Sequence, residues 1–106
     1  MRDFSYRLTH LANADIDHIW ESIARDNPDA ADRVVYEIYE QVRLLASFPE
    51  AGHIREDLAA GRPLLFLPAG KYMIAYLAHS HPLVVIRILH AARNLSAILD
   101  EQQMDF

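Results

Sequence analysis

The side chains best suited to acid–base and phosphate chemistry lie in the second half of the sequence. They are Arg62, Tyr72, Arg87, His90 and Arg93. Histidine exchanges a proton near neutral pH, and arginine binds a phosphate through two parallel hydrogen bonds. Cleavage of RNA at the 2′-hydroxyl needs a general base, a general acid and cations beside the scissile phosphate. In a nuclease, these five residues would form the catalytic set, with His90 as the acid–base group.

A structural role for the same residues is the favoured interpretation. Arg87 and Arg93 would then pair with acidic residues such as Asp100 or Glu101, and His90 would be a hydrogen-bonded residue at a strand end. The formal net charge is −5. Nucleic-acid binding needs clustered Lys and Arg, so this charge argues against it. We therefore expect no direct binding to DNA.

No cofactor or metal is expected. The 106 residues contain no cysteine, which excludes disulfides, thiolate zinc sites and a cysteine nucleophile. The same absence fits a reducing, cytoplasmic location. His79 and His81 lack nearby carboxylates, so a solvated turn before Pro82 is favoured over a metal site. We expect no signal peptide after Met1 and no membrane span, because no apolar run approaches about 20 residues.

Two amphipathic helices are predicted in the first half. Apolar residues recur at the spacing of one helical face over His10–Asp26, and the hydroxyl of Thr9 can cap its start. Asn27 and Pro28 favour a second helix start, and this helix should run to about Ser47. The connection is so short that the two helices should form an antiparallel hairpin.

Strands are predicted at the N-terminus and throughout the second half. The stretch Ala51–Gly61 between the helices and the later strands is loop-like. The last strand is nearly all apolar, as in a strand buried on both faces, and is placed centrally. Short turns join the last three strands into an antiparallel meander, and the first strand can add at an edge. The predicted strands are Phe4–Leu8, Leu64–Leu67, Lys71–Ala78 and Leu83–His90, and a short helix follows over Asn94–Gln102.

This order predicts an α+β fold. An N-terminal strand and an antiparallel helical hairpin precede an antiparallel sheet, with the helices packed on one face and a short C-terminal helix at the end. Residues 1–106 are expected to form one domain, since the length is close to the commonest domain size.

Two apolar surfaces are candidates for binding a partner. Tyr36 and Leu44 project away from the buried stripe of the second helix, and Tyr39 lies on its flank. Clustered exposed apolar residues mark interaction surfaces. Leu65 and Leu67 lie on an apolar strand that could receive an extended peptide at an unpaired edge. The prolines that flank this strand are instead a possible protection against aggregation.

Acidic residues cluster on and between the two long helices. We predict that they form a solvated face. They are Asp15, Asp17, Glu21, Asp26, Asp29 and Asp32.

Short motifs spread over nearly the whole chain carry a resemblance to a known family. They include Tyr6-Arg7-Leu8-Thr9, Asn27-Pro28, Phe48-Pro49 with Gly52 and Arg55, Gly61-Arg62, the run from Tyr72 to Tyr76 and the run from Arg87 to Arg93. In this order and spacing the chain resembles the RelE/ParE toxin superfamily, and its ParE-like branch in particular. The fold of that family agrees with the fold predicted above.

The resemblance implies a partner and a poison. The partner would be a cognate antitoxin, ribbon-helix-helix and ParD-like, that forms a hetero-oligomer with the toxin. RelE-like members cut mRNA on the ribosome, whereas ParE-like members inhibit DNA gyrase and need no nuclease chemistry. The acidic net charge favours the ParE-like hypothesis, without catalytic residues. The alternatives are a ribosome-dependent mRNA endonuclease and an inactive relic that still binds antitoxin.

On the ParE-like hypothesis, two groups of residues have binding roles. Arg87, His90 and Arg93 would contact the target. The antitoxin would contact Tyr36, Tyr39, Leu44, Leu65 and Leu67.

Overall fold

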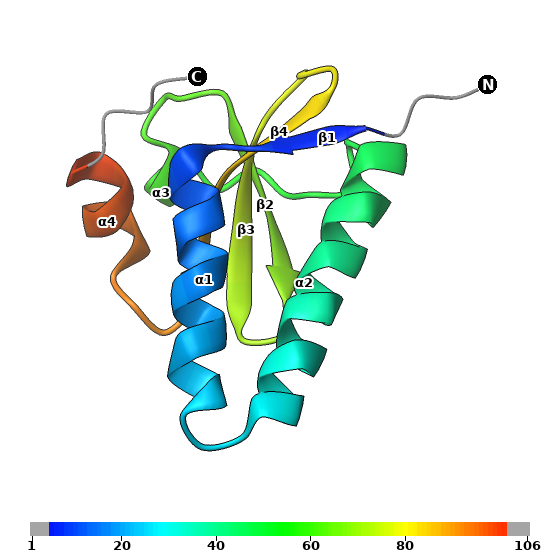
Figure 1. Cartoon of the computed structure of the whole chain (residues 1–106). Helices are drawn as coiled ribbons and strands as arrows, with labels where there is room; N and C mark the ends of the chain where they lie inside the picture. Colours follow the sequence, from blue (N-terminus) through cyan, green and yellow to red (C-terminus); the bar gives the residue numbers. More distant parts are fainter. Residues whose placement is uncertain (1–4, 102–106) are drawn as a thin grey trace.

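A computed structural model describes residues 5–101, apart from the side chain of Glu101. Figure 1 shows a sheet flanked by a long helical hairpin and two short helices. Phe4 and Gln102, at the ends of two predicted elements, lie outside the described residues. In chain order the elements are β1 (Tyr6–Leu8), α1 (His10–Ala24), α2 (Pro28–Ser47), α3 (Glu56–Ala59), β2 (Leu64–Ala69), β3 (Tyr72–Leu77), β4 (Leu83–His90) and α4 (Leu95–Glu101).

The long helices α1 and α2 form the predicted antiparallel hairpin. Each begins where a polar side chain accepts a backbone N–H that the first helical turn leaves free. The hydroxyl of Thr9 accepts from Ala12 at 3.1 Å, and the side-chain oxygen of Asn27 accepts from Ala30 at 3.0 Å. These two caps fix the starts of both helices at the positions predicted from the sequence.

The sheet is mixed, where the sequence predicted an antiparallel one. Its strand order is β1-β4-β3-β2. Strands β2, β3 and β4 form the predicted antiparallel meander, but β1 pairs with β4 in parallel. No tight turn joins β1 to β4, because the whole hairpin lies between them, so turn geometry does not impose an antiparallel direction. The central place of β4 and the edge place of β1 are confirmed.

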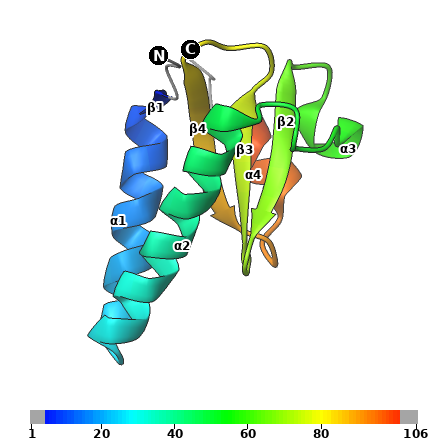
Figure 2. The same ribbon diagram turned by 90° about the vertical axis from the view of Figure 1, so that its right-hand side faces the viewer.

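Helices cover both faces of the sheet, where the sequence predicted one face. Figure 2 shows α1 and α2 on one side of the strands and α3 and α4 on the other. Helix α4 packs on α3. Helix α3 is a single turn that lies within the stretch predicted as a loop, Ala51–Gly61. The cause lies in β2 and β4, whose side chains are apolar on both faces and need cover on both.

Two groups of buried side chains fill the spaces above and below the sheet. The hairpin-side core lies between the sheet and α1 and α2, and includes Ile16, Ile38, Val42, Leu45, Ile74, Tyr76, Val85 and Ile88. The far-side core lies under α3 and α4, and includes Leu58, Leu64, Phe66, Val84, Ile86, Leu89, Leu95 and Leu99.

A bulge in β4 changes which of its residues face the hairpin. Ala75 pairs with Arg87 but the next residue, Tyr76, pairs with Val85, so Ile86 is an extra residue in the ladder. Val85 and Ile88 are three residues apart, yet both belong to the hairpin-side core. A regular strand would place them on opposite faces. The bulge therefore shifts the alternation of β4, so that Val85 and Ile88 both face the hairpin.

Asp15 is the main exception to the predicted solvated acidic face, because it lies inside the fold at 9% exposure. Its carboxylate accepts two hydrogen bonds from the guanidinium of Arg87, from Nε and Nη2, each at 2.8 Å. It also accepts the backbone N–H of Ile88 at 2.9 Å. Strand β1 pairs with β4 only as far as Val85, so the carboxylate takes the place of a missing strand at Ile88.

A second buried polar contact fixes the loop after α2. The side chain of Tyr76 is fully buried; its hydroxyl donates to the carbonyl of Pro49 at 2.6 Å and accepts the N–H of Gly52 at 2.9 Å. Burial raises the pKa of Tyr76, so the hydroxyl stays protonated at neutral pH and remains a donor. A Cβ at Gly52 would come within 2.7 Å of the Tyr76 ring, so only glycine fits there.

We expect Asp15→Ala to lower the free energy of unfolding by about 3–5 kcal/mol, because it leaves the Arg87 charge buried without a partner. Urea unfolding followed by circular dichroism measures the change. Replacing Arg87 as well, in Asp15→Ala/Arg87→Met, should recover part of the loss. The matched control Asp57→Ala removes the exposed partner of Arg55 and should change stability little. Equal losses in the two single variants would contradict the proposed weight of the buried pair.

Tyr76→Phe should lower the free energy of unfolding by about 1–3 kcal/mol, since it leaves the Pro49 carbonyl and the Gly52 N–H without their partner. Thermal and urea unfolding give the measurement. Tyr36→Phe is the control, because the Tyr36 side chain is exposed and water can replace its hydroxyl contacts. A Tyr76→Phe protein as stable as the original would show that the loop does not depend on this hydroxyl.

Candidate functional site

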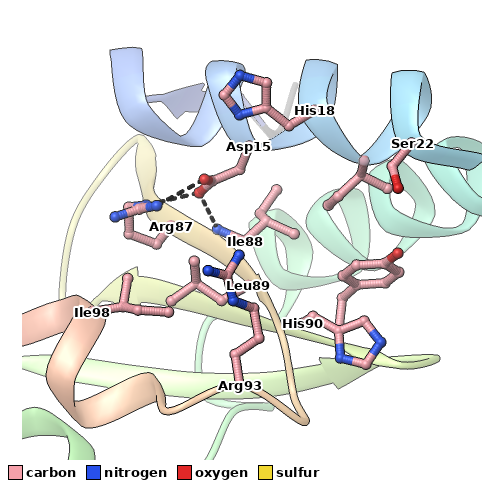
Figure 3. A pocket seen from close by; sticks show the side chains of 11 residues that line it. Asp15, His18, Ser22, Arg87, Ile88, Leu89, His90, Arg93 and Ile98 are labelled. Carbon is pink, nitrogen blue, oxygen red and sulfur yellow. Dashed lines mark hydrogen bonds and ion pairs between the residues drawn. The ribbon is translucent and has the colours of Figure 1, made fainter.

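A cleft of about 700 Å³ lies between α1, the end of β4 and α4. Figure 3 shows its side chains. Helix α1 supplies one wall, the last residues of β4 and the loop after it supply the floor and opposite wall, and Ile98 of α4 closes one side. The polar and charged residues of the lining are Asp15, His18, Ser22, Tyr72, Arg87, His90 and Arg93.

Arg87 lies at the floor of this cleft with only 8% of its surface exposed. The sequence-based structural interpretation paired it with Asp100 or Glu101, and this pairing is wrong, since its partner is Asp15. The reason is that the bulge and the unpaired edge of β4 bring α1 within reach. The third nitrogen, Nη1, is buried and has no hydrogen-bond partner among residues 5–101.

His90 ends β4 and packs against Tyr72 of the neighbouring strand. The two rings meet edge to face, with centroids 5.2 Å apart and planes at 76°. Strand pairing explains the contact, because Tyr72 and His90 are directly opposite in the ladder between β3 and β4. The Nδ1 atom of His90 accepts the backbone N–H of Ala92 at 3.1 Å. Both predicted site residues therefore line the cleft, and His90 is hydrogen-bonded at the strand end.

Arg93 stands in the loop after β4 and is exposed. Its guanidinium extends into the cleft from the side opposite α1 (Figure 3). No acidic side chain described in the structure forms an ion pair with it. Among the described side chains, Arg93 is thus the candidate arginine without an ion pair; the side chain of Glu101, one of its predicted partners, lies outside the described residues.

Arg62 lies away from the cleft and holds α3 and α4 together. Its guanidinium donates to the carbonyls of Ala59, Leu58 and Leu99 at 2.7–2.9 Å, and to Asp100 at 3.2 Å. Asp100, which the sequence offered as a partner for Arg87 or Arg93, pairs with Arg62 instead. The structure therefore brings Tyr72, Arg87, His90 and Arg93 together but places Arg62 elsewhere.

Tyr36 and Leu44 lie exposed on the outer face of α2, at 62% and 41% exposure. Phe48, the C-cap of α2, is 61% exposed and lies four residues after Leu44, so it extends this apolar surface, although no partner-binding role was predicted for it. Its spacing from Leu44 was the signal that could have found it. We call Tyr36, Leu44 and Phe48 the outer strip. Arg43 places its guanidinium 6.0 Å from the Tyr36 ring and also pairs with Glu40.

The other candidate partner residues are less exposed. Tyr39, Leu65 and Leu67 are partly buried and pack against the hairpin-side core. Burial, with further contributions from Tyr6 and Asp17, raises the pKa of Tyr39. These three side chains offer a partner only their outer edges.

Strand β2 is an edge strand, as predicted, but the centre of its free edge is occupied. The backbone of Phe66 exchanges two hydrogen bonds with His53, at 2.7 and 2.9 Å. The N–H of Leu64 donates to the carbonyl of Arg62, and Pro68 has no N–H. In an antiparallel ladder, alternate residues direct their backbone N–H and C=O groups away from the paired strand, and these three residues of β2 direct theirs away from β3. The edge thus keeps no free N–H from them for an added strand.

No cluster of three or more His, Asp or Glu side chains among residues 5–101 could hold a metal ion. None of the described helices is both long and apolar enough to span a bilayer.

Comparison with solved structures shows that the fold occurs in a known protein. The chain is similar to a chain described as the chromosomal ParDE TA system from P. aeruginosa, with a TM-score of 0.67 and 22% identity. The match covers 81% of this chain and 94% of the other. No curated protein matches.

A family model gives the assignment. The model described as the ParE toxin of the type II toxin–antitoxin system, parDE, matches residues 6–95. That range runs from β1 to the first residue of α4 and includes both walls of the cleft. The chain therefore belongs to the ParE toxin family of type II toxin–antitoxin systems.

Proposed function

We propose that this ParE-type toxin acts by binding other proteins, with no catalytic step. Its cognate antitoxin, of the ribbon-helix-helix ParD-like type, neutralises it in a hetero-oligomer. In the cytoplasm, the free toxin inhibits DNA gyrase and thereby stops the growth of the cell.

The observation that carries this proposal is that two of the three candidate arginines, Arg62 and Arg87, are engaged in contacts within the protein. A nuclease needs cations free to hold the scissile phosphate. Arg87 gives two of its nitrogens to Asp15 inside the fold, and Arg62 gives its guanidinium to three carbonyls and Asp100 on the far side of the sheet. Of the three, only Arg93 has no ion pair with a side chain that the structure describes, and a single unpaired arginine is a poor phosphate clamp. The net charge of −5 further disfavours RNA.

The outer strip supports the antitoxin part of the proposal. Aromatic and aliphatic side chains that stay exposed on one helix face are the usual anchors of a protein interface. Tyr36 and Leu44 of α2, with Phe48 at its C-cap, provide such a face, with shallow hollows beside Tyr36 and between Leu44 and Phe48. Because the centre of the β2 edge is blocked by His53, we place the main antitoxin contact on this helix, with Tyr39, Leu65 and Leu67 at its margins.

Expression of the chain alone should stop growth, and the purified protein should inhibit the supercoiling reaction of gyrase. Transcripts in the arrested cells should remain intact, because no nuclease step is involved. His90→Ala is the most informative variant, because a nuclease would lose its acid–base group, whereas a binding mechanism would lose at most one of its target contacts. Supercoiling inhibition that survives in His90→Ala to within a few fold supports a binding mechanism.

Three other outcomes would contradict the proposal. Cleaved transcripts with gyrase unaffected, and loss of toxicity in His90→Ala, would point to an endonuclease. Unimpaired growth with a folded protein that binds antitoxin would identify an inactive relic. A folded protein that binds no antitoxin would remove the partner from the proposal.

Tyr36→Ala and Leu44→Ala should each weaken the complex with the antitoxin by about tenfold or more, because truncating an interface anchor costs at least roughly 1–2 kcal/mol. Isothermal titration calorimetry with the purified antitoxin gives the dissociation constants. Ile54→Ala is the matched control, since Ile54 is a similarly exposed apolar side chain outside the outer strip. Unchanged affinity in both α2 variants would move the antitoxin to another surface.

A further inference from the structure

The floor of the cleft contains a charged donor that the chain itself does not use. Nη1 of Arg87 is buried, and no hydrogen-bond acceptor among residues 5–101 contacts it. Side-on pairing of Nε and Nη2 with Asp15 directs Nη1 away from that carboxylate (Figure 3). Buried polar groups are nearly always paired, and an unpaired charged donor is costly. An anion that reached this nitrogen would satisfy a hydrogen bond left open by the fold.

The charges around the cleft favour an anion as well. Two arginines, Arg87 and Arg93, line the cleft against one aspartate, Asp15, which leaves one net positive charge with histidines neutral. The chain as a whole has a formal net charge of −5. Arg93 is exposed and makes no ion pair with any described side chain. Arg93 is therefore the arginine that an incoming anion can contact directly, whereas Nη1 of Arg87 is covered in this conformation.

The other residues of the lining favour a carboxylate on a peptide over the phosphates of a nucleic acid. Ile19, Ile88, Leu89 and Ile98 give the cleft an apolar share that suits the side chains of a peptide. A nucleic-acid backbone would bring several phosphates to a surface where the acidic net charge repels them. A single carboxylate next to apolar side chains fits the one net charge and the apolar lining together.

We propose that this cleft receives an acidic side chain, Asp or Glu, carried with neighbouring apolar residues on a segment of the protein that the toxin poisons. Arg93 captures the carboxylate at the entrance, and Nη1 of Arg87 is the second donor. This inference rests on the proposed function, in which the poison acts on a protein. It gives the two arginines different roles, because Arg87 also holds α1 to β4 through Asp15, whereas Arg93 makes no ion pair with a described side chain.

The first experiment tests the cleft without any partner. Sodium acetate and inorganic phosphate are titrated separately into the isotope-labelled chain at constant ionic strength, and backbone amide shifts are followed by NMR. Acetate should shift the amides of Ile88, Leu89 and Ile98 saturably. Arg93→Gln should abolish the response. The matched control Arg7→Gln, which removes the same charge from the exposed surface of β1, should keep it. No saturable acetate response, or tighter binding of phosphate than of acetate, overturns the proposal.

The second experiment uses the partners. Arg93→Gln should require about tenfold more toxin for half-inhibition of supercoiling, the effect of one lost charge-assisted hydrogen bond. Its affinity for the antitoxin should match that of Arg7→Gln, because the outer strip belongs to α2 and its C-cap, which supply no residue to the cleft. Full inhibitory strength in Arg93→Gln would overturn the inference and leave the proposed function standing. A parent chain that does not inhibit gyrase contradicts the proposed function, whereas the acetate titration still decides the chemistry of the cleft.

Discussion

One buried carboxylate, that of Asp15, joins the parts of this fold that do not follow each other in the chain. It links α1 to β4 through Arg87 and through the backbone N–H of Ile88. The need arises because β1 is only three residues long and leaves the second half of the β4 edge without a strand partner. Leaving a buried N–H without an acceptor lowers the free energy of unfolding by about as much as a typical point mutation does. Leaving a buried arginine without its partner lowers it more. The position of α1 and the wall of the cleft both depend on this contact.

The same interaction determines which chemistry remains possible at the cleft. By holding Arg87 inside, Asp15 removes one cation from the set that a phosphate site would need. Arg62 is removed by a different route, since it holds α3 and α4 on the far side of the sheet. What remains around His90 and Arg93 is a small positive patch with apolar neighbours. Such a patch suits recognition of a protein surface better than strand scission, and agrees with an acidic chain.

The blocked edge of β2 places a further limit on how partners can bind. His53 and Pro68 occupy or remove the hydrogen-bonding groups that an added strand would use, and the Tyr76 contact to Pro49 and Gly52 fixes the start of the loop that carries His53. The exposed apolar side chains of α2 therefore offer a partner more contact area than the edge of β2 does. The two proposed binding surfaces therefore draw on different elements, the outer strip on α2 and the cleft on α1, β4 and α4.

Local sequence determined the elements, because their signals act within a few residues. Thr9 and Asn27 cap the two long helices by bonds to residues three positions on, and the apolar run before His90 marked the central strand. Tertiary structure decided what depends on long-range contacts. The parallel direction of β1, the cover of the second sheet face and the Asp15–Arg87 pair depend on contacts between distant residues; β1 and β4 pair residues 77 positions apart, and Asp15 and Arg87 are 72 positions apart. One signal for Asp15 was present, since it lies between Ala12, Ile16 and Ile19 on the buried face of α1. Its partner was not foreseeable, because only the bulge and the open edge of β4 bring Arg87 and Ile88 to it.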